Sequence, residues 1–367
     1  MNILQYISRL DASGAARSGA LLALGLARRG HRVRVACGSG GPLARELESG
    51  GVPVMVLPER RHRFDRSRTR TLLHEIESAL PDLLHINNLS LDGPALAAVA
   101  RRHGVPVAWH VREDPASRRA RRLRRRLLAR ADVVIAVSRE IQTGLAPHGS
   151  GTIVVVPNGI EPGPPPDSGA ARRACGLDPA ALWIGWLGRI VRRKGALDFL
   201  QAAAGLHGDA GPGRLILAGR PAADRDGTLY MEEIDRFQRE RPGLEARVLR
   251  VPEPEALPRL VEGLDVLVVP SYWEGCSRVV LEGMRAARAI VAYDTGGTPE
   301  ILRNGVSGLL VPAGDRDGLR AAILKLAGDE ALRLRLGTAA RAAVTDELSL
   351  TRHLDAMENL YDKMLRR

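Results

Sequence analysis

The chain has little cysteine: its 367 residues include only Cys37, Cys175 and Cys276. Three widely separated cysteines neither form a disulfide framework nor have metal-ligand spacing, and they fit a reducing compartment. Long apolar runs are also missing, since no stretch approaches the ~18 residues that a membrane-spanning helix needs. The opening residues lack the basic region and apolar block of a secretory signal. We therefore expect a cytoplasmic protein.

Lysine is rare as well, occurring only at Lys194, Lys325 and Lys363, so arginine carries almost all the positive charge. That charge is unevenly placed. Residues 1–161 contain 25 Arg against 14 Asp and Glu, whereas the rest of the chain is close to neutral. A strongly basic half beside a neutral one predicts that the first half alone faces an anionic partner.

Short apolar runs, in contrast, are abundant, and they alternate with amphipathic helical patterns such as residues 18–29 and 93–102. Continuous apolar strands separated by helices predict parallel sheets covered on both faces. The first half contains NILQYI, HRVRVAC, PVMVLP, DLLHIN, PVAWHV, DVVIAVS and TIVVVPN. The second half contains LWIGWLG, RLILAG, EARVLRV, DVLVVPS and AIVAYD.

The alternation is interrupted once, at the stretch EPGPPPDSGA of residues 161–170. Its prolines can neither continue a helix nor pair within a central strand, so it is interpreted as an interdomain linker. We predict two doubly wound α/β domains, residues 1–165 and 166–348, with a small ligand bound in the cleft between them. Residues 349–367 form a single amphipathic pattern and predict a C-terminal helix.

The most informative motif follows the apolar run DVLVVP. A loop with Glu274 leads to a helix that is expected to begin near Ser277, its N-cap. Backbone amides at this helix N-terminus would favour a phosphate. Two interpretations of the glutamates follow from the residues alone. Glu282, on the helix, and Glu274 could hold a ribose and a sugar hydroxyl on either side of a diphosphate, or Glu274 is a solvated loop residue and Glu282 an exposed helix residue. The residues at this N-terminus are Gly275, Cys276 and Ser277.

This stretch resembles the glutamate-x7-glutamate segment of the retaining glycosyltransferases of family 4, which have the GT-B fold. The positions that match in register are Pro270, Ser271, Glu274, Gly275, Leu281, Glu282, Met284, Gly296, Gly297, Pro299, Glu300, Gly308, Leu310, Val311, Pro312, Gly314 and Asp315. The departures from the family pattern are Cys276 and Ser277 for Phe-Gly, Gly283 for Ala and Ala289 for Pro.

A second motif, GWLGRIVRRKG, places Arg189 and Lys194 between a strand that ends at Gly188 and the following helix. Two cations at a strand's carboxyl end suit a leaving diphosphate, whose charge grows as the glycosidic bond breaks. The motif resembles the family's G-R-x4-K-G element, which clamps the donor diphosphate. Arg192 and Arg193 are interpreted as solvated turn residues.

The first domain resembles the family at fewer positions. Gly14 and Arg17 follow the first strand, where the family has a glycine-rich loop that approaches the donor diphosphate. His110, at the end of PVAWHV, occupies a position where a family histidine touches the transferred sugar. Ser138, as a helix N-cap, and Asn158, before an interdomain loop, match structural landmarks.

The resemblance implies two Rossmann-like domains facing a central cleft, with helix 349–367 packing back on the first. It implies transfer of a sugar from a UDP- or GDP-sugar to an acceptor hydroxyl, with retained anomeric configuration and without a metal or cofactor. Arg189 and Lys194 would stabilise the departing diphosphate, Glu282 the ribose, Glu274 the sugar hydroxyls and His110 the sugar's far edge. Further donor contacts are expected from Gly14, Arg17, Gly188, Val251, Gly275, Cys276, Ser277 and Arg278.

Two Asp-x-Asp strings, at residues 224–226 and 315–317, resemble the metal motif of another glycosyltransferase fold. They do not follow buried strands in that context, and we interpret both as loop and helix-capping acids. No other cluster has metal-ligand spacing, so the sequence predicts no metal site.

The arginine-rich segment 118–130 carries eight arginines, and its leucines fall at helical spacing. A solvated basic face, a nucleic-acid contact and an anionic membrane surface are three interpretations. Aromatic residues make up only 3% of the chain and none interleaves with these arginines, so no nucleic acid is expected. We favour an anionic membrane surface, or a lipid-linked anionic acceptor, on the cytoplasmic face of the membrane.

Taken together, the motifs predict a glycosyltransferase of bacterial cell-surface polysaccharide, lipopolysaccharide or glycolipid synthesis. Two alternatives belong to other classes. A nucleotide-sugar epimerase with the GT-B fold would share the cleft but not the glutamate pattern. A non-catalytic basic protein that binds membrane or nucleic acid would not depend on Glu274 and Glu282.

Overall fold

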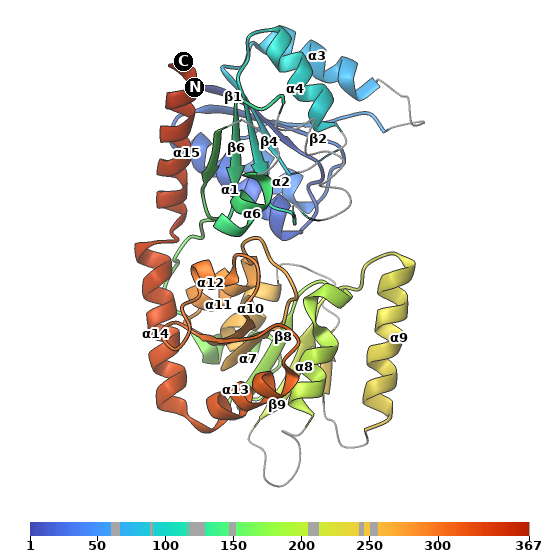
Figure 1. Ribbon diagram of the computed structural model, residues 1–367, viewed down its shortest axis with the longest axis vertical. Coiled ribbons are helices and arrows are strands. Elements are labelled where there is room, and N and C mark those ends of the chain that lie inside the picture. The colour runs from blue at the N-terminus through green and yellow to red at the C-terminus, as the bar shows by residue number, and fades with distance from the viewer. Residues whose placement is uncertain are drawn as a thin grey trace. The chain divides into compact units, whose positions relative to one another are not determined.

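The computed structural model describes residues 1–59, 67–88, 90, 92–114, 116, 129–146, 152–204, 213–241, 246–249 and 256–366. The chain divides into two compact units, Met1–Gly159 with Leu350–Arg367, and Ile160–Ser349. Each unit is a parallel sheet covered by helices, as the sequence predicted (Figure 1). The boundary falls after Gly159, so the proline-rich stretch of residues 161–170 opens the second unit.

The sheet of the first unit has the strand order β3-β2-β1-β4-β5-β6-β7. All seven predicted runs form strands, and β4, β5 and β6 are buried along their whole length because helices cover both faces. The order reverses direction between β1 and β4. The strands are β1 (Asn2–Ile7), β2 (Arg32–Cys37), β3 (Val54–Val56), β4 (Leu83–Asn87), β5 (Val107–Val111), β6 (Val133–Ala136) and β7 (Thr152–Val155).

The helices of this unit largely follow the predicted patterns. Helix α1 begins earlier than expected, so Gly14 and Arg17 belong to its first turn and not to a preceding loop. Ser13 is the N-cap, and the alanine-rich sequence after it favours helix from the first position. The helices are α1 (Gly14–Arg28), α2 (Pro42–Ser49), α3 (Ser67–Ala79), α4 (Gly93–Arg102), α6 (Arg139–Leu145) and α15 (Leu350–Leu365).

Helix α15 completes the core of the first unit, although 190 residues separate it from the rest of that unit. Its buried side chains recur every three or four residues and pack with those of α1 and the sheet. They are Leu350, Leu354, Met357, Tyr361 and Met364. Two polar contacts flank this apolar packing: Arg29 binds Asp355 at 2.7 Å, and the His31 ring lies 2.7 Å from Glu358.

The sheet of the second unit has the order β10-β9-β8-β11-β12-β13. Its three-residue edge strand β13 was not predicted. The strands are β8 (Trp183–Leu187), β9 (Arg214–Ala218), β10 (Ala246–Leu249), β11 (Val266–Val269), β12 (Ala289–Tyr293) and β13 (Leu309–Val311). The helices are α7 (Ser168–Ala174), α8 (Ala196–Ala203), α9 (Arg225–Arg239), α10 (Ala256–Gly263), α11 (Arg278–Arg285), α12 (Thr298–Ile301), α13 (Arg316–Gly328) and α14 (Glu330–Asp346).

Several polar residues whose role the sequence did not decide are N-caps of helices. Asp224 accepts a hydrogen bond from the Gly227 amide at 2.8 Å, and Asp315 one from the Gly318 amide at 2.9 Å. Both Asp-x-Asp strings therefore supply N-caps, as predicted. Ser138 caps α6 in the same way.

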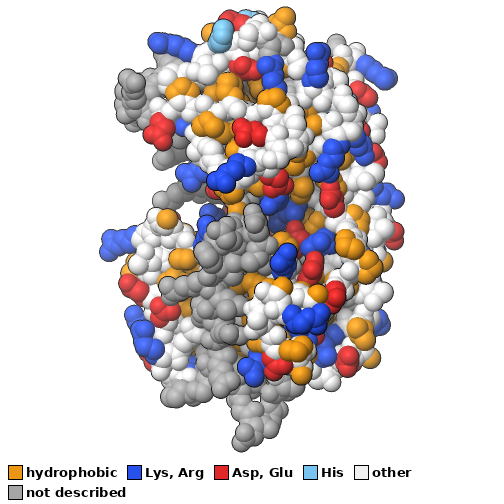
Figure 2. Space-filling model, turned by 180° about the vertical axis from the view of Figure 1, so that it is seen from behind, with side chains coloured by type: hydrophobic (Ala, Val, Ile, Leu, Met, Phe, Trp, Pro, Cys, Tyr) orange, Lys and Arg blue, Asp and Glu red, His pale blue; other side chains and the backbone are white. Residues whose placement is uncertain are grey.

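Surface charge is mixed in sign on the face that Figure 2 shows, where Lys and Arg side chains alternate with Asp and Glu. Within the described residues, no helix combines the length and apolar character needed to cross a membrane.

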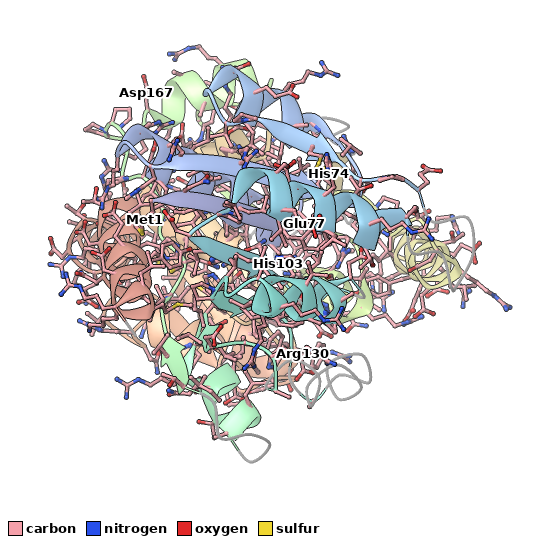
Figure 3. The ribbon with its side chains drawn as sticks, turned by 90° about the horizontal axis from the view of Figure 1, so that it is seen from above. Met1, His74, Glu77, His103, Arg130 and Asp167 are labelled. Atoms are coloured by element: carbon pink, nitrogen blue, oxygen red, sulfur yellow. The ribbon has the colours of Figure 1, made fainter. Side chains whose placement is uncertain are left out.

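At the amino ends of the first unit's strands, Figure 3 labels Met1, His103 and Arg130, which precede β1, β5 and β6. His103 and Glu77 lie side by side there, with 3.6 Å between Nε2 and Oε1. Exposed pairs of this kind contribute about 0–1 kcal/mol each, so this edge is an ordinary solvated surface.

Shortening a buried side chain of α15 should lower the free energy of unfolding of the first unit. Met357 is fully buried, so Met357→Ala should cost about 2–5 kcal/mol. Leu365, on the same helix, is 39% exposed, and Leu365→Ala should cost no more than about 0.5 kcal/mol. Denaturant-dependent hydrogen exchange at β1 amides measures both, and equal losses would show that α15 is not part of this core.

Candidate active site

The predicted residues of the second unit gather where its sheet changes direction. Strand β8 is paired with β9 on one side and with β11 on the other, so the chain order reverses between β8 and β11. The loops after these two strands leave the same edge of the sheet in neighbouring positions. In open α/β sheets, ligands bind at the carboxyl ends of the strands at such a switch point.

The loop after β8 carries Lys194 and is anchored by its own backbone. The Trp186 indole donates to the Lys194 carbonyl at 2.9 Å. Gly195 then starts α8 with a φ of 67°, and a Cβ there would collide with the Pro270 carbonyl oxygen at the end of β11. Only glycine allows this approach, which holds the loop against its neighbour.

Two hydrogen bonds and an ion pair connect this loop to the loop after β11. The Tyr272 amide donates to the Arg193 carbonyl at 2.8 Å, and the Arg193 guanidinium donates to the Trp273 carbonyl at 3.3 Å. The Lys194 ammonium binds the Glu274 carboxylate, and both side chains are largely buried. The structure therefore brings the two predicted motifs into direct contact, and Arg193 serves as a link between loops although it is exposed.

The loop after β12 supports Glu274 from the other side. The Gly297 amide donates to the Glu274 carbonyl at 2.8 Å. Gly296 has a φ of 56°, and a Cβ there would collide with the same carbonyl oxygen. This glycine pair belongs to the matching family pattern, but its role in seating Glu274 was not predicted.

Glu282 is held by two arginines of its own helix. Oε1 accepts from Arg278 at 2.8 Å and Oε2 accepts from Arg285 at 3.0 Å. Arg285 also binds Glu262 of α10 at 2.9 Å. Arg278 was predicted to touch the donor, whereas here its guanidinium holds Glu282. Both pairs could have been predicted from the sequence, because Arg278 and Arg285 lie four and three residues from Glu282 on the same helix.

Ser277 is the N-cap of α11, as predicted, but its side chain makes no capping hydrogen bond. Its hydroxyl is buried and has no partner within the described part of the chain. Gly275 is buried and Cys276 is half-buried beside it. The N-terminus of an α-helix at this edge favours an anion.

The remaining predicted donor residues have different surroundings. Arg189 is exposed and makes no ion pair with any described residue. The Gly188 amide donates to the Ala218 carbonyl at 3.0 Å, so it does not face a ligand. Arg17 binds Glu46 of α2 at 2.6 Å. Val251 lies outside the described residues.

His110, at the end of β5, is buried, with 0% of its surface exposed. Its ring is stacked 6.2 Å from that of His353 on α15 and lies 5.5 Å from that of His85. Burial, followed by the positive charge of Arg112, lowers the pKa of His110 well below its usual value. His110 is therefore neutral near pH 7.

Comparison with known proteins places the chain in a family. The model of glycosyltransferase family 4 matches residues 12–163, and that of the group 1 glycosyl transferases matches residues 181–329. The lipopolysaccharide core biosynthesis mannosyltransferase LpsB of Rhizobium meliloti (strain 1021) is 30% identical over 249 residues, which cover 65% of this chain and 68% of that protein. The chain belongs to the group 1, family 4 glycosyltransferases.

Two further similarities extend this finding. The D-inositol 3-phosphate glycosyltransferase of Corynebacterium jeikeium (strain K411) is 30% identical over 68% of this chain and 61% of that protein. This chain thus spans about two thirds of the length of both curated relatives. The crystal structure of Anabaena HepE in complex with UDP-glucose has a TM-score of 0.85 at 19% identity, over 99% of this chain and 100% of that one. The predicted GT-B fold is confirmed.

The close approach at Gly195 should be measurable as a stability difference between two glycine variants. Gly195→Ala combines an unfavourable φ, about 1–2 kcal/mol, with a backbone collision. Gly176→Ala is the matched control, because Gly176 has a φ of 64° and open space around its would-be Cβ. We expect Gly195→Ala to lose at least about 1 kcal/mol more than the control in urea unfolding. Equal losses would contradict the contact with Pro270.

Proposed function

We propose that this glycosyltransferase moves a sugar from a nucleotide diphosphate sugar to an acceptor hydroxyl with retention of anomeric configuration. The contact between Lys194 and Glu274 at the switch point carries this proposal. It places a cation suited to phosphate and a carboxylate suited to hydroxyl groups side by side, beside the N-terminus of α11. A sugar attached to a diphosphate has both of these chemical groups next to one another.

The cations of the β8 loop would stabilise the leaving diphosphate. The Lys194 ammonium has three N–H donors, and its contact with Glu274 occupies one of them. The other two and the exposed guanidinium of Arg189 are available to the phosphate oxygens as their charge increases. A phosphate oxygen of the leaving group then takes the acceptor's proton, so the reaction requires neither an enzymic base nor a metal ion.

Glu282 would accept hydrogen bonds from the ribose hydroxyls. Its two bonds from Arg278 and Arg285 fix the orientation of the carboxylate. A carboxylate offers about four acceptor sites, so two remain for the hydroxyl groups of a ligand. Glu274 would bind the sugar hydroxyls in the same manner.

The relatives' names guide the choice of substrates. HepE was solved with UDP-glucose, and LpsB is named a mannosyltransferase of lipopolysaccharide core synthesis. We propose a UDP- or GDP-sugar as donor and an acceptor of bacterial cell-surface glycan or glycolipid synthesis. The net positive charge of the first half fits an anionic acceptor.

We also propose a cytoplasmic location, with peripheral contact to an anionic membrane surface or lipid-linked acceptor through segment 118–130. Residues 117–128 lie outside the described residues. The composition of segment 118–130 supports the proposal, because each arginine near an anionic lipid surface contributes about 1 kcal/mol to membrane binding.

Nucleotide binding tests the catalytic proposal. A thermal-shift series with UDP, GDP, ADP and their common sugars in EDTA should give a clear shift with one base. A ligand at ~100 times its dissociation constant adds about 2.7 kcal/mol of stability. Arg189→Ala should weaken that shift and lower kcat about 10²–10³-fold, because it removes charge stabilisation of the leaving group.

Arg320→Ala is the matched control, since Arg320 is an exposed arginine of the same unit, on α13. It should leave both the shift and kcat unchanged. Absence of a shift with every nucleotide would overturn the proposed donor, and a requirement for added divalent cation would overturn the metal-free mechanism.

Flotation with vesicles tests the membrane proposal. Replacement of Arg124, Arg125 and Arg126 by Gln should weaken binding to anionic vesicles by about 3 kcal/mol, with little binding to zwitterionic vesicles in any variant. The control replaces three exposed arginines of the second unit, Arg225, Arg239 and Arg320, by Gln. Equal loss in both triple variants would attribute the binding to net charge alone.

A further inference from the structure

A buried polar cluster occupies the carboxyl edge of the first unit's sheet, where α15 covers it. Each buried polar group in such a cluster requires a hydrogen-bond partner. Its members come from β4, β5, the segment after β7 and α15. They are His85, Asn87, His110, Arg112, Asn158, His353 and Tyr361.

Arg112 lies at the centre of this cluster and is only 9% exposed. Its Nε donates to Oδ1 of Asn87 at 3.0 Å, and one terminal nitrogen donates to Oδ1 of Asn158. The other terminal nitrogen lies 3.2 Å from Nδ1 of His110. A single guanidinium thus contacts three polar side chains from three different segments of the chain.

A guanidinium has only N–H donors and keeps its proton at any ordinary pH, so each atom it contacts must act as an acceptor. For Asn87, this assigns the oxygen to Arg112 and leaves the amide nitrogen to donate to the Ala15 carbonyl, at 3.1 Å. For His110, the lone pair must lie on Nδ1. The one proton of the neutral ring is then on Nε2.

We propose that Arg112 is a positioning residue that fixes His110 in the neutral, Nε2-protonated tautomer and holds the start of α1 through Asn87. Nε2 of His110 is buried and has no hydrogen-bond partner within the described part of the chain. The ring therefore presents an N–H donor, which suits a hydroxyl or carbonyl oxygen, and it does not present a base. The significance for catalysis rests on the proposed function, whereas the tautomer does not.

Burial and the positive charge of Arg112 oppose the protonation of His110. Arg112 places a positive charge against Nδ1, and the rings of His85 and His353 lie on the β4 and α15 sides. Burial, followed by Arg112 and then His353, lowers the pKa of His85 to about 3, and Nδ1 of His85 lies 2.6 Å from the Tyr361 hydroxyl. Nδ1 of His353 lies 2.7 Å from the Pro157 carbonyl, which accepts a hydrogen bond there. A proton on His110 would put a second cation beside Arg112 in a buried site.

Two-bond 1H–15N correlation spectra of the full chain, with 15N-labelled histidine, report the tautomer directly. The His110 signals are assigned by their loss in His110→Gln. We expect an unprotonated Nδ1 and a protonated Nε2, unchanged between pH 6 and pH 8. A protonated Nδ1 or an imidazolium pattern in the wild type would overturn the proposal, and this measurement does not depend on any variant's folding.

Arg112→Met keeps an unbranched apolar stem and removes the guanidinium donors, so His110 should change to the other tautomer or to a mixture. Arg172→Met is the matched control. Arg172 is also 9% exposed and also donates three hydrogen bonds, to the Gly263 and Pro179 carbonyls and to Asp265, but it lies in the second unit. It should lose stability and leave the His110 spectrum unchanged. An unchanged spectrum in folded Arg112→Met would overturn the assignment to Arg112.

Kinetics separate this inference from the proposed function. With the donor identified by thermal shift, Arg112→Met should lower kcat/KM about 10- to 100-fold through misplacement of groups at the site. A wild type with the expected tautomer but no transferase activity would overturn the proposed function alone. An active wild type with the opposite tautomer would overturn the role of Arg112 alone.

Discussion

Three loops of the second unit approach one another more closely than side chains at the contact points would allow, and the arrangement of the site depends on this approach. Gly195 and Gly296 make it possible, because each has a positive φ and faces a carbonyl oxygen of the neighbouring loop. They press the loops after β8 and β12 against the loop that carries Glu274. Lys194 and Glu274, 80 residues apart in sequence, meet as a result.

Pairing of charges then determines what these loops present to a ligand. An unpaired carboxylate in a largely buried position costs several kcal/mol, so Glu274 and Glu282 each require a cation nearby. Lys194 serves the first, and Arg278 and Arg285 serve the second. In the first unit, the Arg112 guanidinium contacts Asn87 and His110, and there it determines which atoms donate and which accept. In both units, basic side chains orient the polar groups at the carboxyl edge of the sheet.

Much of this arrangement followed from sequence pattern. Apolar runs predicted every strand except β13, which is short and lies at the sheet edge. The start of α1 was predicted too late, because small residues such as Gly14 signal a loop but are also tolerated in a first helical turn. His110 was predicted as a sugar contact, which stays a prediction. That His353 stacks on it could not be predicted, because α15 is remote in sequence.

The sequence by itself determined the class of fold and the family. It also singled out two glutamates and two cations of the second unit as candidate site residues. These depend on local spacing, and spacing along a strand, loop or helix is a property of the chain alone. Only the tertiary structure decided the partners that are not neighbours on one helix: that Lys194 binds Glu274 and that Arg112 contacts His110. A side chain's partner depends on which segments pack together and exclude water, and the strengths of charge pairs and hydrogen bonds change with that exclusion.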